Sequence, residues 1–335
     1  MSKWYNEKGN NNDIVLASKI RLARNLRSIP FPCKMTNEMR KSVCKKIYAS
    51  VQNSNLAGEF DLIELDKISD LEKVSLAERG LITTRLAKNN QYSAVLVSKD
   101  EDMSVMLCED DHIRLTTRVE GLELEKAYQM ANTLDDIFIK SLNIAFDDKL
   151  GFLTSNPMNL GTGMKASVLL HLPAIAQKGI MPTLKNMLGK LGFSIKSIFA
   201  DDCFFELSNE ISLGITEEST INNLNGIIEQ ISKQERELRQ ELMAENDFED
   251  KIFRAIGTLK MARQLSAKEL FSLVSLARLG IALSLFDNNE NIDFSTLDSM
   301  LFTLGTATIM SSTKEGLTQE EANKLRANYI RERLG

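Results

Sequence analysis

Short apolar stretches separated by polar turns mark two parts of the chain as β structure. Residues 92–98 (YSAVLVS) and 103–107 (MSVML) flank a polar turn, and this pattern predicts a hairpin. Residues 192–199 (GFSIKSIF) and 203–207 (CFFEL) flank a turn at 201–202 and predict a second hairpin. Consecutive hairpins favour an antiparallel sheet over a doubly wound parallel one.

The pattern becomes helical at residue 221. Ile221, Leu224 and Ile228 recur at helical spacing, and the later segment KQERELRQE is highly charged. This arrangement predicts a helix over 221–246 that buries one apolar face. We expect this helix to close a first domain, which comprises residues 1–246.

The remaining residues, 247–335, have helical character almost throughout. Ser266 with Glu269, and again Thr318 with Glu321, have the spacing of a capping box at a helix start. The sequence therefore predicts a second domain that is all-α.

The composition indicates a cytoplasmic protein without a strong electrostatic field. The 335 residues include 41 lysines and arginines against 46 aspartates and glutamates, so a net charge of -5 offers no global basic surface to nucleic acid or an anionic membrane. Four widely spaced cysteines argue against a zinc site and a disulfide framework. No apolar leader and no run of about 18 apolar residues occurs. Residues 6–13 (NEKGNNND) predict a flexible lead-in, with ordered structure from about Ile14.

Two cationic segments have the features of a phosphate site. In 17–24 (ASKIRLAR), strand alternation places Lys19 and Arg21 on one face, although a solvated edge strand gives the same pattern. In 159–167 (NLGTGMKAS), a glycine loop next to Lys165 could hold phosphate oxygens on backbone N–H groups. A lone GxG is more often a turn, and this loop lacks the P-loop spacing.

Lys196 and Arg114 add two further cations. The planar guanidinium of Arg114 can donate two parallel hydrogen bonds to a phosphate, and it stays charged at any working pH. Together the four segments predict a cage for nucleotide phosphates.

The stretch CEDDHIR, residues 108–114, sets three carboxylates beside one of only two histidines. It is open to three interpretations, namely a metal site, a catalytic cluster and a charged turn. Successive residues of an extended chain point to opposite sides, so the four residues from Glu109 to His112 cannot all converge on one ion. This alternation disfavours a protein-bound metal.

Taken together, these segments resemble the phosphagen (guanidino) kinase family, most closely the bacterial protein arginine kinases of the McsB type. The matching stretches are ASKIRLARN against SSRIRLARN, CEDDHIR against NEEDHIR, GFLTSNPMNLGTGMKASVLLHLP against GYLTxCPTNxGTGxRASVMLHLP, FELSNEISLG near SNQxTLG, and DFEDKIFRAIGTLKMAR in the helical domain. The resemblance covers nearly the whole chain. It implies an α+β fold in which helices flank an antiparallel β-sheet, followed by a C-terminal all-α domain.

The resemblance also implies a reaction, the transfer of the γ-phosphoryl group of ATP, which carries Mg2+, to arginine side chains of proteins. Such a transfer needs cations around the phosphoryl oxygens and carboxylates that align the weakly nucleophilic guanidinium. The catalytic residues that the resemblance implies are Asp110, Glu109 and Asp201. Asp110 matches the family's catalytic glutamate, Glu109 precedes it, and Asp201 falls near a second acidic position. The residues implied to bind ATP are Ser18, Lys19, Ile20, Arg21, Arg114, Lys165, Ala166, Ser167, Val168, Leu169, Lys196, Ser197, Ile198, Phe199 and Ala200.

Several positions depart from the family pattern. Asp110 is one methylene shorter than glutamate, Asn156 stands in place of a reactive cysteine, and Gly80 replaces a histidine. Three family arginines are lysines here, namely Lys19, Lys165 and Lys196. Lysine keeps the charge but loses the two-pronged hydrogen bonding of arginine.

The resemblance extends to the C-terminal domain and to partners. Arg326 and Ala327 match the family's phosphoarginine-sensing motif, which implies a degenerate sensing site at Arg326. We expect a homodimer joined through the helical domain, a role in stress response, and protein substrates with exposed arginines. An activator protein and Clp-protease machinery are further implied partners.

The sequence leaves two functions open. One is a working protein arginine kinase with lysines in its phosphate cage, and the other is a catalytically impaired member that acts as an interaction module through its helical domain. A small-molecule guanidino kinase is disfavoured, because we expect no N-terminal domain of the kind that supplies part of the substrate pocket in those enzymes.

Overall fold

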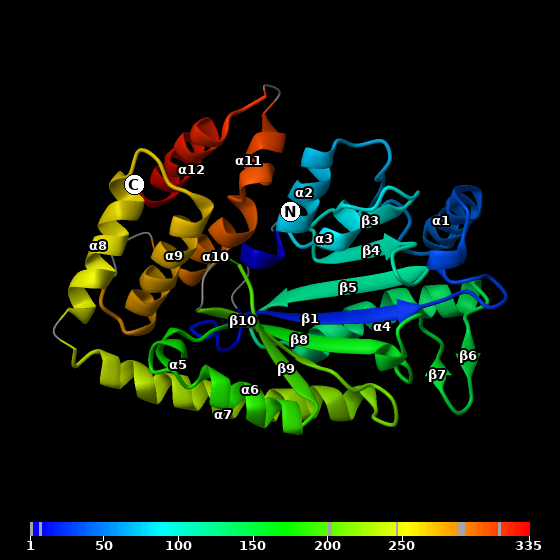
Figure 1. Ribbon diagram of the computed structural model, residues 1–335, viewed down its shortest axis with the longest axis horizontal. Helices are drawn as coiled ribbons and strands as arrows, with labels where there is room; N and C mark the ends of the chain where they lie inside the picture. The colour runs from blue at the N-terminus through cyan, green and yellow to red at the C-terminus, as the bar shows by residue number, and fades with distance from the viewer. Residues whose placement is uncertain (1–2, 7–8, 200–202, 246, 287–291, 314–315) are drawn as a thin grey trace.

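An antiparallel β-sheet forms the centre of the computed structural model, which describes residues 3–6, 9–199, 203–245, 247–286, 292–313 and 316–335 (Figure 1). Its strand order is β2-β3-β4-β5-β1-β8-β10-β9. The strands are β1 (Val15–Arg24), β2 (Phe60–Glu64), β3 (Ala94–Ser98), β4 (Met103–Leu107), β5 (Ile113–Glu120), β8 (Met164–His171), β9 (Phe193–Ser197) and β10 (Phe204–Asn209), with β6 (Phe146–Asp147) and β7 (Gly151–Phe152) as a separate small pair. Both predicted hairpins, β3–β4 and β9–β10, are confirmed.

Helices α1, α4 and α7 cover one face of this sheet. The helices of this part are α1 (Asn37–Gln52), α2 (Asp70–Glu78), α3 (Thr84–Ala87), α4 (Leu124–Ser141), α5 (Pro173–Gln177), α6 (Met181–Lys190) and α7 (Glu217–Leu242), with 3-10 turns at Trp4–Asn6, Pro32–Lys34 and Pro157–Asn159. On α4, Ala127, Ala131, Leu134 and Phe138 recur at helical spacing and are fully buried in the main core. The other face is covered at the β2–β4 edge by α2 and α3, where Leu76 and Leu86 pack with apolar strand residues.

The C-terminal residues form the predicted helical domain, which packs at the end of the sheet (Figure 1). Its helices are α8 (Phe248–Met261), α9 (Ala267–Ala282), α10 (Phe294–Thr303), α11 (Thr306–Ser312) and α12 (Gln319–Leu334). Thr318 and Glu321 form the predicted reciprocal capping box at the start of α12. The predicted division at 246/247 falls between α7 and α8. Among the described helices, none is long and apolar enough to cross a membrane.

The N-terminal segment does not behave as the sequence analysis expected. Trp4 is buried and packs against Phe302 of α10, with ring centroids 4.9 Å apart. The backbone oxygen of Asn12 accepts a hydrogen bond of 2.7 Å from Arg278 of α9. The prediction of a flexible lead-in is therefore wrong for the described residues of this segment, because polar turn residues are fixed here by contacts with a distant domain.

A carboxylate of the first domain caps a helix of the second. Glu78, at the end of α2, accepts hydrogen bonds from the backbone N–H groups of Ala307 (3.0 Å) and Thr308 (2.8 Å) in the first turn of α11. A negative charge is favourable at a helix N-terminus, where backbone donors lack intrahelical partners. This contact joins the helical domain to the α2–α3 region, which borders the site.

Candidate active site

Six cationic side chains lie on one face of the central strands. Directly paired residues of neighbouring strands point to the same side of a sheet. Arg21 pairs with Lys165, and Lys19 pairs with Arg118. Extending this alternation across β5, β1, β8, β10 and β9 gives the complete set, namely Lys19, Arg21, Arg114, Arg118, Lys165 and Lys196. The predicted phosphate cage therefore has its cations on a common surface.

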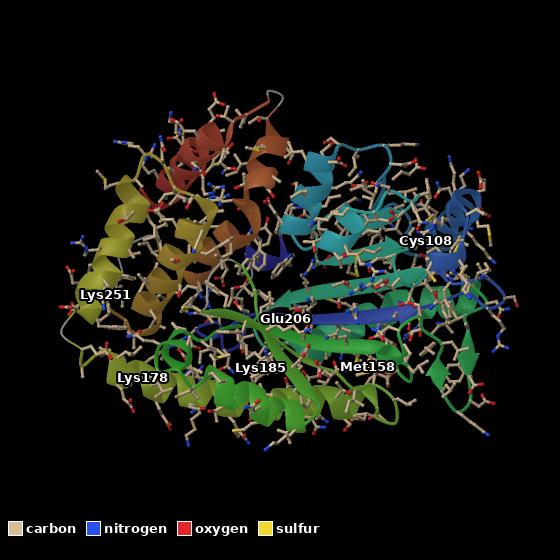
Figure 2. The ribbon with its side chains drawn as sticks, viewed as in Figure 1. Cys108, Met158, Lys178, Lys185, Glu206 and Lys251 are labelled. Carbon is tan, nitrogen blue, oxygen red and sulfur yellow. The ribbon has the colours of Figure 1, made fainter. Side chains whose placement is uncertain are left out.

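A pocket of about 240 Å³ opens among these cations. Its lining includes Arg21, Arg114 and Lys165 together with Asp110. Met158 also lines the pocket and marks its place in Figure 2. In that view the label of Glu206 lies between Met158 and the C-terminal helices. The fold thus brings β1, β5 and β8 together around one small polar pocket.

The electrostatics of this pocket favour an anionic ligand. Burial, with repulsion from Arg114, lowers the pKa of Arg21 to about 10. Burial, with repulsion from Arg21, lowers the pKa of Lys165 to about 8. The buried Nε atoms of Arg21 and Arg114 have no hydrogen-bond partner within the described part of the chain. Because buried unpaired donors are costly, a bound anion would relieve both the repulsion and the missing hydrogen bonds.

Glu206 of β10 lies among the cations. It forms an ion pair with Lys19, and each side chain keeps about a quarter of its surface exposed, 26% and 24%. Burial raises the pKa of Glu206, but the charge and hydrogen bond of Lys19 lower it further, to about 2. Glu206 therefore stays ionised, so the cage contains one fixed negative charge. The sequence analysis did not predict this residue as part of the site.

The loop that carries the candidate catalytic carboxylates turns sharply where β4 ends. Cys108 has a φ of 59°, and its N–H donates to the backbone oxygen of His112 at 3.0 Å. Glu109 follows this turn, is buried, and forms an ion pair with Arg114. Its carboxylate also accepts a hydrogen bond from the hydroxyl of Thr83. Glu109 is thereby fixed beside the phosphate cage.

Asp110 lies at the rim of the pocket. One of its carboxylate oxygens contacts Nη1 of Arg85 at 2.7 Å, and the other is 4.0 Å from Nη1 of Arg114. Its side chain is 32% exposed, so solvent or a ligand can approach. A carboxylate in this position can align a cationic group next to a phosphate bound in the cage.

Asp111 and His112 have structural roles. Asp111 accepts hydrogen bonds from Nδ2 of Asn25 (2.6 Å) and from the backbone N–H of Ser155 (2.7 Å). Nδ1 of His112 accepts from the backbone N–H of Leu26 at 3.0 Å, and burial lowers the pKa of this histidine. Across the described residues, no group of three or more histidine, cysteine or acidic side chains could hold a metal ion. The CEDDHIR cluster is thus divided between the pocket and the scaffold that supports it.

Two family profiles together match nearly the whole chain. The profile of the ATP:guanido phosphotransferase C-terminal catalytic domain matches residues 39–238, and that of the protein-arginine kinase McsB C-terminal domain matches residues 245–335. The chain belongs to the ATP:guanido phosphotransferase family.

Relatives of similar length within this guanido phosphotransferase family carry the name protein-arginine kinase. The one from Clostridium acetobutylicum is 37% identical over 342 residues and the match covers 100% of both chains. The one from Clostridium novyi is 38% identical over 346 residues, which cover 100% of this chain and 98% of the relative. The one from Brevibacillus brevis is 36% identical over 343 residues, which cover 99% of this chain and 95% of the relative.

Solved structures of guanidino kinases share the fold. The duplicated taurocyamine kinase from Schistosoma mansoni, with bound components of a transition-state analogue, superposes with a TM-score of 0.63 at 22% identity and covers 77% of this chain and 38% of that chain. Lombricine kinase superposes with a TM-score of 0.59 at 18% identity, and the match covers 70% of this chain and 69% of that chain. The expected α+β fold, with helices flanking an antiparallel sheet, is confirmed.

Some residues that the guanido phosphotransferase resemblance implied as ATP contacts have side chains on the opposite face of the sheet. They are Ser18, Ile20, Ala166 and Val168. All four are fully buried, and the hydroxyl of Ser18 donates to the backbone oxygen of Gly121 at 2.8 Å. Strand alternation thus directs these side chains away from the cage, so that only the backbone of these positions could contact a ligand there.

The remaining predicted nucleotide contacts are distributed along the sheet. Ser167 pairs with Lys19 on the cage face, and Lys196 and Ser197 are exposed at the end of β9. Leu169, Ile198 and Phe199 instead pack in the apolar cluster shared with the helical domain, so their side chains are committed to that cluster. Ala200 and Asp201 lie outside the described residues.

Two departures from the family pattern have local structural reasons. Gly80 has a φ of +71°, and a Cβ built there would lie 3.0 Å from Nη2 of Arg118, which donates to the Gly80 backbone oxygen. A side chain at this position would be strained and would crowd Arg118. Asn156 caps the 157–159 turn, because its side chain accepts from the N–H of Met158 at 3.1 Å. The sequence analysis missed Arg118, although the period-two alternation of 113–120 puts it on the same face as Arg114 and could have identified it.

Arg326 is fully buried in the helical domain. Its guanidinium donates to the backbone oxygens of Leu304 (2.8 Å) and Leu265 (2.6 Å), and to the side chains of Asn323 (2.7 Å) and Thr306 (2.8 Å). These bonds hold the α10–α11 junction to α12. In this conformation the side chain is not accessible to a phosphoarginine ligand, which argues against the implied sensing site.

Proposed function

We propose that this protein transfers the γ-phosphoryl group of MgATP to the guanidinium of arginine side chains in proteins. The observation that carries the proposal is the position of Asp110 on the rim of a pocket lined by Arg21, Arg114 and Lys165. A carboxylate next to a cluster of phosphate-binding cations is the arrangement that such a transfer requires. The protein-arginine kinase relatives, which match along their full length, support the choice of acceptor.

The residues of the pocket divide the chemistry between them. Arg21, Arg114 and Lys165 would bind the phosphate oxygens of MgATP and neutralise charge as the γ-phosphoryl group moves. Asp110, fixed next to Glu109, would hold the acceptor guanidinium in line with that group. The bond from the γ-phosphorus to the bridging oxygen breaks, a bond to a guanidinium nitrogen forms, and the released proton passes to Asp110.

The alternative of a catalytically impaired interaction module gains no support from the relatives, which are named as kinases. Two of the departures that motivated it, Gly80 and Asn156, have the local structural explanations given above. Lysine in place of arginine keeps the positive charge that a phosphate requires.

The proposal has several further parts. We place the reaction in the cytoplasm, on protein substrates with exposed arginines, within a stress response. A homodimer joined through the helical domain, an activator protein and Clp-protease machinery are the proposed partners. The degenerate Arg326 position, buried in this conformation, contributes nothing to the proposed catalytic step.

The test is a direct phosphoryl-transfer assay. The full chain is incubated with MgATP and an unfolded arginine-rich protein, and acid-labile phosphate on arginine is detected by mass spectrometry. We expect phosphoarginine on this substrate and none on a matched substrate in which lysine replaces arginine. Absence of product from protein that is folded and binds MgATP would refute the proposal.

A further inference from the structure

Arg85 places a guanidinium on the candidate catalytic carboxylate. It belongs to α3, and its Nη1 lies 2.7 Å from Oδ1 of Asp110. Oδ2 of the same carboxylate is 4.0 Å from Nη1 of Arg114, which faces the phosphate cage. Asp110 therefore lies between the cage on one side and a guanidinium of its own chain on the other.

We propose that Arg85 is an intramolecular competitor of the substrate, which the acceptor arginine must displace from Asp110. The inference rests on the proposed function, because it takes Asp110 as the group that receives the acceptor guanidinium. It adds that the acceptor position is already taken by the protein itself in the absence of substrate.

The chemistry of the two groups is the first argument. Arg85 has the same planar head group as the proposed acceptor, and a carboxylate recognises that head group through the same hydrogen bonds in both cases. One oxygen of Asp110 is engaged by Arg85, and the other is directed toward Arg114. A guanidinium that binds both carboxylate oxygens of Asp110 in a bidentate pair therefore needs Arg85 to leave Oδ1.

The anchoring of α3 is the second argument. Thr83 caps this helix, since its side chain accepts from the N–H of Leu86 at 3.0 Å. The hydroxyl of the same Thr83 donates to Glu109, the neighbour of Asp110. The helix that carries Arg85 is thus attached to the catalytic loop itself, which keeps the competing guanidinium at a high effective concentration near Asp110.

The surroundings of Arg85 permit exchange. A cavity of about 420 Å³ is lined by residues that include Cys33, Arg85, Lys88, Glu109 and Asp110, and of its lining only Asp110 also lines the phosphate pocket. The Arg85 side chain is 76% exposed. It can rotate away without leaving a buried charge, because an exposed ion pair is weak and screened by salt. The competition is therefore modest, on the order of a two- to fivefold effect on substrate affinity.

The test measures equilibrium binding of a short blocked peptide that contains one arginine. The full chain is saturated with a non-hydrolysable ATP analogue, and peptide Kd is compared for wild type, Arg85→Ala and Arg85→Lys. We expect Arg85→Ala to tighten binding about two- to fivefold at low salt, with Arg85→Lys intermediate. The gain should shrink at high salt, and a peptide with lysine in place of arginine should show none.

Arg254→Ala is the matched control. Arg254 on α8 is also highly exposed, at 77%, and pairs with Asp250 at 3.9 Å, so its removal should leave peptide binding unchanged. The inference would be overturned if Arg85→Ala bound the arginine peptide with unchanged or weaker affinity. It would also be overturned if neither wild type nor Arg85→Ala bound that peptide.

Kinetics separate this role from a positioning role. A competitor predicts a lower KM for the protein substrate in Arg85→Ala with kcat preserved, whereas a residue that positions Asp110 predicts a lower kcat. Peptide binding needs no turnover, so the inference is decided by binding even if no phosphoarginine forms. Failure of the proposed function would show as missing product in every variant.

Discussion

Lys19 of β1 and Glu206 of β10 form an ion pair across the intervening strand β8, at the centre of the face that carries the phosphate cage. The two residues are 187 positions apart in the sequence. Their pairing places a carboxylate where an anionic ligand would otherwise meet only cations. Glu206 therefore affects both the stability of the cage and its affinity for phosphate.

Glu206→Gln should lower stability, because it leaves the largely buried charge of Lys19 without its partner. About a quarter of the surface of each side chain is exposed to solvent. We therefore expect the free energy of unfolding to fall by about 2 kcal/mol, a value between those for exposed and fully buried ion pairs. Thermal unfolding checks this value, and Glu237→Gln, an exposed residue on α7, is the control. Equal melting temperatures for the two variants would contradict the prediction.

The same variant gives a prediction in acid. The pKa of Glu206 is lowered to about 2 in the folded protein, so its contribution is present above the unfolded value of about 4.5 and is lost as the pH falls toward 2. The stability difference between wild type and Glu206→Gln should therefore shrink between pH 4.5 and pH 2. Denaturant unfolding at several pH values measures the difference in unfolding free energy between the two proteins. A difference that stays constant with pH would count against the Lys19–Glu206 ion pair.

Nucleotide affinity should fall as the pH rises through 8. Lys165 has a pKa of about 8 in the free protein, so most of its charge is present at pH 7 and most is lost at pH 9. If its charge is needed to hold phosphate, MgATP binding weakens by up to about tenfold over this range. Titration calorimetry at pH 7, 8 and 9 tests this.

Lys165→Arg is the matched variant for that titration. The ordinary pKa of arginine lies about two units or more above that of lysine, so in the same surroundings the charge is kept to higher pH and the fall in affinity between pH 7 and 9 should become much smaller. If MgATP affinity fell equally between pH 7 and pH 9 in wild type and Lys165→Arg, the titrating group would be one other than Lys165.

Local patterns in the sequence predicted the features that depend on neighbouring residues. Alternation placed Lys19 and Arg21 on one face, and the spacing of Thr318 and Glu321 predicted a capping box that the structure contains. Such features follow from the period of a strand or from the geometry of one helix turn. They need no knowledge of which strands pair.

Features that depend on strand order could not be predicted in this way. The charge of Glu206 in CFFEL is visible in the sequence, but its position among the cations exists only because β8 lies between β1 and β10. Arg85 lies in a short helix whose contact with Asp110 depends on how α3 packs beside the β4–β5 loop. Family resemblance gave Asp110 its expected catalytic role, yet it also assigned Ser18 and Ile20, whose side chains the strand register directs away from the cage.

Cys33 should be the first thiol to react with an alkylating reagent. It is exposed, whereas Cys44 and Cys108 are buried, and it lines the cavity next to Asp110. A maleimide adduct would fill part of that cavity, so we expect a higher KM for protein substrate with MgATP affinity unchanged. Peptide mapping identifies the modified residue, and insensitivity of Cys33→Ser to the reagent attributes the effect to this thiol. Loss of nucleotide binding upon modification would place the adduct elsewhere.

Asp110 should be required for phosphoryl transfer and dispensable for nucleotide binding. Asp110→Asn keeps the shape but removes the charge that aligns the guanidinium and accepts its proton, so the transfer rate should fall by about 100-fold or more. Asp110→Glu keeps the carboxylate on a chain one methylene longer and should stay within about tenfold of wild type. Single-turnover formation of phosphoarginine measures both rates, and MgATP affinity measured in parallel serves as the control. Asp110 lines the same pocket as Arg21 and Lys165, and its carboxylate is 4.0 Å from Arg114. A loss of MgATP affinity in Asp110→Asn would therefore mean that the carboxylate organises the cage rather than the acceptor.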